Sequence, residues 1–350
     1  MMREPKSVLV VSLGGLGDFL TRWPLWQSLR KTFPHAIISY LGYHAHGALL
    51  VSVGLCDEML DFNEARWSRP DKNPKSSLDP EVFGTEGQIP RPPRLSESDG
   101  GQANPKYELL ISILGTRGKA WAAQLMGDQI GQVVEIEPFP GEGAGVPVRG
   151  YILAQALSVG FADPGAIQVN IPVRVRTWAD GFWRARGLSG KRVIAVHPGS
   201  GGRSKNWPGD RFSVLAARLA AHGAAVIVLE GEAEEDHPGS GDGVRGAPGV
   251  LRVSNYELIK VAGLLARCDY YIGNDSGISH LAALLRVAST VIFGPTDPAR
   301  WAPVGMERVT VVKHPFPCAP CARAQRDQCA ERRCLTGIGV DEILRTVMLT

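Results

Sequence analysis

Residues 272–285 read Ile-Gly-Asn-Asp-Ser-Gly-Ile-Ser-His-Leu-Ala-Ala-Leu-Leu, and this stretch decides the fold. The run 268–272 that leads into this stretch predicts a short buried strand. At the end of the stretch, Leu281, Leu284 and Leu285 recur at helical spacing. Residues that cap helix starts stand at the junction, namely Asn274, Asp275 and Ser276. A helix that begins at the carboxyl end of a strand directs free N–H groups and its positive dipole end at whatever lies above. The stretch therefore predicts a diphosphate site.

Taken alone, the turn at 273–277 is explained equally well as an ordinary strand-to-helix turn with a good cap. A second polar turn favours a ligand site instead. Phe293-Gly294-Pro295-Thr296-Asp297-Pro298 again follows an apolar strand, residues 288–293. Two small polar loops thus fall at neighbouring strand ends, where ligands bind in open α/β sheets.

Length and composition indicate a soluble protein of about two domains, since the chain has 350 residues with 44% apolar and 21% charged residues. A net charge of +3 without basic runs argues against nucleic acid as a partner. No apolar run approaches the roughly 18 residues of a membrane span, and residues 1–7 lead into a strand without a signal-peptide cleavage site. We expect a cytoplasmic protein, with peripheral contact to the inner face of the membrane left open.

Strands and helices alternate in both halves of the chain. The first half predicts strands at 8–11, 36–41, 107–114 and 133–136, and helices at 19–33, 115–125 and 151–159. The second half predicts helices at 178–186, 210–222 and 256–266, and strands at 192–196 and 225–229. We expect an α/β protein of two Rossmann-like domains, 1–175 and 176–350, facing each other across a cleft. Residues 64–105, rich in Pro, Gly, Ser and charge, predict a loop or insertion.

The first strand and its following turn raise a second hypothesis, a nicotinamide-dependent oxidoreductase. The glycines at positions 14, 15 and 17 do not complete the dinucleotide-binding pattern, because Leu20 holds the third glycine position. The second strand also ends at Leu41-Gly42-Tyr43-His44, without the acidic residue that binds a ribose. Both departures disfavour this hypothesis.

Five motifs occur in order along the chain: Gly14-Gly15-Leu16-Gly17-Asp18, His197-Pro198-Gly199-Ser200, Lys205-x-Trp207-Pro208, Gly273-Asn274-Asp275-Ser276-Gly277-x-x-His280, and Gly294-Pro295-Thr296-Asp297-Pro298. As a set they resemble family 9 glycosyltransferases, the ADP-heptose:lipopolysaccharide heptosyltransferases. The resemblance implies a GT-B fold, with an N-terminal acceptor-binding domain and a C-terminal nucleotide-sugar-binding domain. It also implies inverting transfer of a heptose or related sugar, from an ADP-sugar to a lipopolysaccharide core or another saccharide or lipid-linked saccharide acceptor, without a metal ion or cofactor.

The resemblance assigns Asp18 the role of general base, which takes the proton from the attacking acceptor hydroxyl. The alternative for Asp18 is a plain N-cap of a helix that begins at Phe19. The two roles compete, because a carboxylate bound to helix N–H groups is a poorer base. Lys205 matches the lysine that holds the nucleotide phosphates and stabilises the charge on the leaving diphosphate, whereas an exposed loop lysine is the ordinary alternative.

The remaining assignments concern substrate contacts. We expect Ser200 and Gly201 to donate backbone or hydroxyl hydrogen bonds to the same phosphates. Glu235 fits best as the ribose-binding acid among several glutamates that a solvated helix start explains equally well. His280 is either a ligand to diphosphate or sugar or a buried, satisfied histidine. The full set of expected substrate contacts is Gly15, Gly17, Ser200, Gly201, Glu235, Asn274, Asp275, Ser276, Gly277, His280, Thr296 and Asp297.

Two departures from the family pattern concern the acceptor. The first 60 positions hold no clear set of basic residues for an anionic acceptor, and Arg22, Arg30 and Lys31 are interpreted as ordinary helix charges. The insertion at 64–105 is also atypical. A third hypothesis is therefore a catalytically silent nucleotide-sugar-binding module of the same fold.

The segment 314–335 holds four of the six cysteines, in the spacing Cys318-x2-Cys321-x7-Cys329-x4-Cys334. A structural Zn²⁺ or an iron–sulfur cluster is compatible with this spacing, but the second pair is not C-x-x-C as in common zinc ribbons. The sequence alone favours reduced thiols in a reducing compartment and keeps a metal as the alternative.

Overall fold

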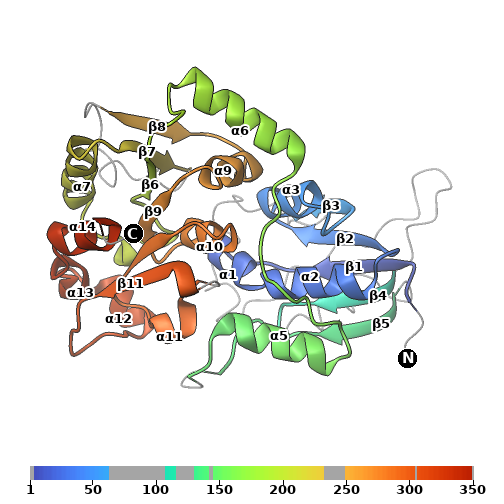
Figure 1. The fold of residues 1–350 in the computed structure, drawn as a ribbon. Coiled ribbons are helices and arrows are strands. Elements are labelled where there is room, and N and C mark those ends of the chain that lie inside the picture. The colour runs from blue at the N-terminus through green and yellow to red at the C-terminus, as the bar shows by residue number, and fades with distance from the viewer. Residues whose placement is uncertain are drawn as a thin grey trace, which may run out of the picture. The chain divides into compact units, whose positions relative to one another are not determined.

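The structure is a computed structural model that describes residues 4–62, 107–115, 130–141, 145–231, 249–303 and 306–348. Its contacts form two compact units (Figure 1): the first spans Met1–Gly14, Arg22–Ala144 and Val148–Gly165, and the second spans Gly15–Thr21, Gly145–Pro147 and Ala166–Thr350. The predicted insertion at 64–105 and the predicted helix at 115–125 lie outside the described residues, apart from Gly115. The division of acceptor and donor binding between 1–175 and 176–350 stays a prediction.

The first unit contains a parallel five-stranded sheet in the order β3-β2-β1-β4-β5. Its central strand is entirely apolar after its first residue and buried there, as a parallel strand covered on both faces requires. The strands are β1 (Ser7–Val11), β2 (Ile37–Gly42), β3 (Glu58–Asp61), β4 (Tyr107–Ser112) and β5 (Ile130–Glu135). The helices in the described part of this unit are α2 (Trp23–Thr32), α3 (His44–Ser52) and α5 (Val148–Ser158).

The predicted single helix at 19–33 is wrong in its bounds. The structure has two helices, α1 (Leu16–Thr21) and α2, interrupted at Arg22. Pro24 explains the break, because a proline ring inside a continuous helix clashes with the carbonyl four residues earlier, whereas a helical first turn tolerates it. The chain also enters its first helix three residues earlier than Phe19, at Leu16.

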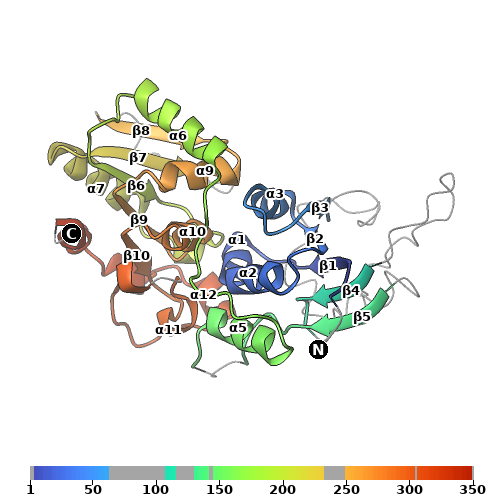
Figure 2. The ribbon, with the colours of Figure 1, turned by 45° about the vertical axis from the view of Figure 1, so that its right-hand side comes forward.

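The second unit contains a parallel six-stranded sheet in the order β11-β10-β9-β6-β7-β8 (Figure 2). Its strands are β6 (Val193–His197), β7 (Ala225–Glu230), β8 (Val250–Ser254), β9 (Tyr270–Asn274), β10 (Ser289–Phe293) and β11 (Val309–Lys313). Its helices are α6 (Val173–Ala185), α7 (Gly209–Ala221), α9 (Leu258–Leu265), α10 (Gly277–Leu284), α11 (Pro298–Trp301), α12 (Arg323–Gln328), α13 (Arg333–Thr336) and α14 (Val340–Met348), with the 3₁₀ turns η2 (Arg203–Lys205) and η4 (Met306–Arg308).

One face of the second sheet carries an extensive apolar core. Alternate residues of its strands, such as Ile194 and Val196 of β6, pack with Phe212 and Leu215 of α7 and with α13 and α14. The two Rossmann-like sheets confirm the predicted fold class. Strands β3, β8 and β11 and helices α3 and α14 add elements that the sequence pattern did not reveal. Among the described helices, none has the length and apolar character to cross a membrane.

Candidate active site

The strand order of the second sheet reverses between β6 and β9. From β6 the chain continues to β7 and β8 on one side, and it returns to build β9, β10 and β11 on the other. The register pairs His197 with Gly273, so the two strands end side by side. Such a switch point in an open parallel sheet is where ligands bind. The loops 198–206, 275–276 and 294–297 all leave this edge, and they hold half of the predicted substrate contacts.

Asn274 fixes the loop that follows β6. Its side chain is fully buried, its amide Nδ2 donates to the Pro198 carbonyl at 2.7 Å, and its Oδ1 accepts from the Trp207 backbone N–H at 2.9 Å. One amide therefore holds both ends of the loop that carries Ser200 and Lys205. Asn274 was predicted as a substrate contact, and the structure adds a bracing role.

Asp275, Lys205 and Thr296 meet at the switch point from three different loops. Lys205 Nζ lies 3.4 Å from Asp275 Oδ2, and the Thr296 hydroxyl donates to the same oxygen at 2.8 Å. The Asp275 side chain is 7% exposed and the Lys205 side chain 22% exposed. A buried carboxylate held by a cation and a hydroxyl keeps the Lys205 ammonium in place, and the ammonium has further N–H donors for a ligand.

Ser276 caps helix α10, as predicted for this junction. Its hydroxyl accepts from the Ser279 N–H and lies 3.4 Å from His197 Nδ1. Gly277 begins the helix, and His280 is buried within its first turns. Asp297 caps the short helix α11 by accepting from Ala299 N–H at 2.9 Å. The start of α10 thus presents an ordered N-terminus beside the Lys205–Asp275 pair, to which an anion is attracted.

Ser200 and Gly201 lie in the loop between β6 and η2. Ser200 Oγ lies 2.8 Å from the Gly202 carbonyl and 2.5 Å from Asn206 Oδ1, contacts that shape the turn. A side-chain carbon at Gly201 would have open space around it. Glu235, the predicted ribose ligand, lies outside the described residues.

Asp18 is not the N-cap that the sequence offered as its alternative role. Helix α1 begins at Leu16, which puts Asp18 in its third position, and Asp18 Oδ2 accepts a hydrogen bond of 3.3 Å from the Gly15 N–H. This is the backward half of a capping box, with Gly15 at the cap position. The side chain is half-buried, and one such bond leaves the carboxylate further acceptor sites.

Helix α1 packs against α10 within the second unit. The Leu16 side chain covers Gly277, where an added Cβ would come within 2.5 Å of Leu16 Cγ. On the same face, a Cβ at Gly17 would lie 3.9 Å from His280 Cδ2. The segment Gly15–Thr21 therefore belongs to the same compact unit as the three loops, and Asp18 is carried by a helix that contacts α10.

Comparison with known proteins decides the family. Residues 154–330, just over half of the chain, match the profile of glycosyltransferase family 9 (heptosyltransferase). The chain belongs to this family. A curated relative, lipooligosaccharide heptosyltransferase 2 of Campylobacter jejuni, is 27% identical over 146 residues, an alignment that covers 38% of this chain and 43% of the relative. The chain thus spans less than half the length of that family 9 relative.

Solved structures of family 9 proteins share the fold over nearly the whole chain. A glycosyltransferase family 9 protein from Veillonella parvula superposes with a TM-score of 0.69 at 17% identity, covering 98% of this chain and 96% of the other. The Escherichia coli heptosyltransferase WaaC with ADP gives a TM-score of 0.65 at 16% identity, covering 98% and 99%. These likenesses confirm the GT-B fold type that the motifs implied for a family 9 chain.

The packing of Leu16 on Gly277 predicts that a larger residue at position 277 disturbs the site. Gly277→Ala should move α1, because the new methyl group meets Cβ and Cγ of Leu16 rather than the end of a flexible side chain. We expect a fall in glycosyl transfer of about 10- to 100-fold, measured as kcat/KM, with folding retained. Gly181→Ala in α6, where a Cβ has open space, is the matched control and should leave the rate unchanged. Equal rates for both variants would contradict the packing argument.

Arg22 is not the ordinary helix charge that the sequence analysis inferred. Its side chain is 2% exposed, and its Nη1 donates to Ser12 Oγ and to the Leu13 carbonyl, both at 2.7 Å. Tyr40 donates to the Ser12 carbonyl at 3.1 Å from the neighbouring strand. These bonds hold the end of β1 immediately before the glycine motif of this family 9 chain. A sequence signal existed, since Arg22 shares the helical face of the buried Trp26 and Leu29.

Buried His46 leads us to expect that the first unit is sensitive to acid. Burial, followed by the nearby Arg22 cation, lowers the pKa of His46 from 6.5 to about 4. The unfolded chain binds the proton more readily, so the stability contributed by neutral His46 is complete above pH 6.5 and is lost as the pH falls through 4. A shift of this size corresponds to about 3 kcal/mol.

We therefore expect wild-type protein to lose more stability between pH 7 and pH 4 than the His46→Gln variant does, by a difference of about 3 kcal/mol in urea unfolding. His222→Gln, at the exposed end of α7, is the control and should retain the wild-type acid sensitivity. An unchanged pH dependence in His46→Gln would show that His46 does not titrate during unfolding.

Proposed function

We propose that this chain is an inverting glycosyltransferase that moves a heptose or related sugar from an ADP-sugar to a saccharide acceptor, such as a lipopolysaccharide core or a lipid-linked saccharide. Family membership and the heptosyltransferase relative support the reaction class, and the ADP bound by the E. coli neighbour supports the nucleotide. The observation that carries the proposal is the meeting of Lys205, Asp275 and Thr296 at the switch point beside the start of α10.

In this proposal, electrostatic attraction holds the donor diphosphate at this edge. The Lys205 ammonium and the free N–H groups at the start of α10 supply positive potential where the leaving group gains negative charge. The Asp275 carboxylate holds the Lys205 ammonium in position through their ion pair. As the family resemblance implies, the proposed reaction includes no metal ion at the reacting centre.

Asp18 is the proposed base. The acceptor oxygen forms a bond to the anomeric carbon as the bond from that carbon to the diphosphate oxygen breaks, so ADP leaves with the electron pair. The acceptor proton passes to the Asp18 carboxylate and then to solvent. Attack on the face opposite the leaving group inverts the anomeric centre. The single 3.3 Å bond from Gly15 positions the carboxylate at the start of α1.

We infer that the reaction takes place in the cytoplasm and, for a lipid-linked acceptor, at the inner face of the membrane. Mixing the protein with an ADP-heptose and a lipopolysaccharide-core saccharide tests the proposal. We expect ADP release and a product heavier by one heptose, both dependent on the acceptor, and little turnover with a UDP-sugar. Binding of ADP without donor consumption on any acceptor would instead identify a silent nucleotide-sugar-binding module.

A further inference from the structure

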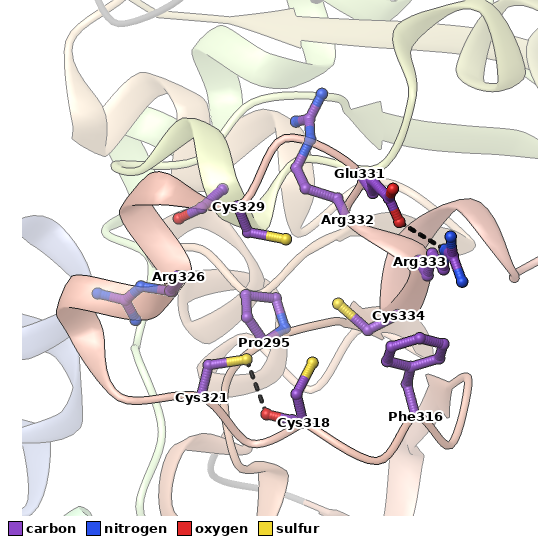
Figure 3. A pocket seen from close by; sticks show the side chains of 11 residues that line it. Pro295, Phe316, Cys318, Cys321, Arg326, Cys329, Glu331, Arg332, Arg333 and Cys334 are labelled. Atoms are coloured by element: carbon purple, nitrogen blue, oxygen red, sulfur yellow. Dashed lines mark hydrogen bonds and ion pairs between the residues drawn. The ribbon is translucent and has the colours of Figure 1, made fainter.

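The segment between β11 and α14 brings four cysteines to one pocket (Figure 3). Cys318 and Cys321 lie in the turn before α12, Cys329 follows α12, and Cys334 lies in α13. All four line the same pocket, and their sulfur atoms face its middle around Pro295. None of the four forms a disulfide. His314, which precedes them in the sequence, packs against Gly337 and is not among the pocket-lining residues.

This segment has little apolar burial to hold its shape. Among the side chains described between residues 315 and 333, none is buried. Helices α12 and α13 have only 6 and 4 residues, too short to be stable by their own hydrogen bonds. A thiolate-bound metal ion supplies folding free energy to small, poorly cored segments of this kind.

We propose that Cys318, Cys321, Cys329 and Cys334 bind one divalent transition-metal ion, Zn²⁺ or Fe²⁺, as a structural tetrathiolate site. Four sulfur ligands in tetrahedral array select these metals. Binding releases the four thiol protons to solvent and moves no electrons. In the described part of the chain, no three His, Cys, Asp or Glu side chains are already arranged to hold a metal ion. Binding therefore draws the thiols inward, and the exposed Cys318 and Cys329 have room to turn.

A hydrogen bond links the first two cysteines of the segment. The Cys321 thiol donates to the Cys318 carbonyl at 2.9 Å, which turns this C-x-x-C pair into a compact loop (Figure 3). The sequence analysis favoured reduced thiols and kept a metal as the alternative, and the convergence of the four thiols on one pocket is what favours the metal.

The cysteine segment also supports the two loops of the candidate active site. Cys321 N–H donates to the Pro295 carbonyl at 2.8 Å, next to Thr296. Arg332 donates to the Arg203 carbonyl at 3.0 Å, and Ser204 to Asp327 at 3.3 Å, which fixes the turn that carries Lys205. A bound metal would therefore stiffen the Lys205 turn. This consequence rests on the proposed function, whereas the metal site itself does not.

Elemental analysis of the full-length protein, purified without chelators, tests the site directly. We expect about one zinc or iron ion per chain, and the element found distinguishes the two metals. After chelation, Co²⁺ should restore a complex with thiolate-to-cobalt and tetrahedral ligand-field absorption bands. The double variant Cys318→Ser/Cys329→Ser changes only exposed thiols and should lose the metal and the cobalt spectrum. Cys268→Ser, outside the segment, should retain both.

Metal content below about 0.2 per chain in wild-type protein, even after reconstitution with Zn²⁺ or Fe²⁺ under reducing conditions, would overturn the proposal. Full metal retention in the double variant would also overturn it, as would an intact mass lower by two hydrogens per disulfide. If the double variant does not fold, chelation and refilling of wild-type protein gives the same answer. If the Lys205 turn depends on the ion, we expect the metal-free protein to bind ADP several-fold more weakly, as measured by calorimetry. Unchanged ADP affinity with loss of metal would contradict only that link.

Discussion

Replacing Asp18 by asparagine is expected to lower kcat for glycosyl transfer by about 10²–10⁴-fold while ADP binding stays at the wild-type level. The substitution keeps the shape of the side chain and an oxygen that can accept the Gly15 N–H. It removes the ability to take a proton from the acceptor hydroxyl. The loss should therefore fall on kcat, measured by ADP release at saturating donor and acceptor, and not on the calorimetric dissociation constant for ADP.

The first-turn aspartate of α7 gives a matched control for this substitution. Asp210→Asn removes the same charge from the first turn of another helix and should leave kcat near the wild-type value, with an effect on stability below about 1 kcal/mol. Turnover unchanged in Asp18→Asn would contradict the general-base role. A loss of ADP binding in the same variant would indicate a structural role for Asp18 in holding α1 instead.

Replacing Lys205 by methionine is expected to weaken ADP binding by about 10- to 100-fold and to lower kcat/KM by about 10²–10³-fold. Two effects add in this variant. The diphosphate loses its cation, and the nearly buried Asp275 carboxylate, now without its ion-pair partner, repels the phosphates. The loss in kcat/KM should exceed the loss in affinity, because charge on the leaving group is greatest in the transition state.

An exposed lysine on α9 provides the control for charge removal. Lys260 pairs with Glu257 at 3.1 Å, with side chains that are 40% and 71% exposed, so Lys260→Met removes a solvent-screened ion pair. This variant should bind ADP and turn over like wild-type protein. Similar ADP affinities for Lys205→Met and wild-type protein would place the diphosphate elsewhere.

Local sequence patterns predicted those parts of the fold that local forces determine. The strand-to-helix junction at 272–285 was predicted with its cap, because Ser276 is bonded by the N–H of a residue only three positions away. The strand before the second polar turn was predicted to lie beside the first, and the register of β9 and β10 confirms it. The predicted helix boundaries were less accurate where another local interaction set them. The bond from the Gly15 N–H to Asp18 sets the start of α1, and Pro24 ends the helical run before α2.

Long-range contacts within the candidate site could not be read from the sequence. Asn274 contacts Pro198 and Trp207, which are 76 and 67 residues away, and no short-range pattern encodes such a pair. The hydrogen bond from Thr296 to Asp275 likewise depends on β9 and β10 being neighbours in register. Motif order pointed to these residues, but the part each one plays in holding the loop required the folded chain.

The position of ADP in a crystal structure of this protein is the most direct test of the central claim, that a nucleotide diphosphate binds at the switch point of the second sheet. The account predicts density for the diphosphate within hydrogen-bond distance of Lys205 Nζ and of the backbone N–H groups at the start of α10. ADP bound at the glycine-rich end of β1, with the Lys205–Asp275 pair untouched, would contradict it.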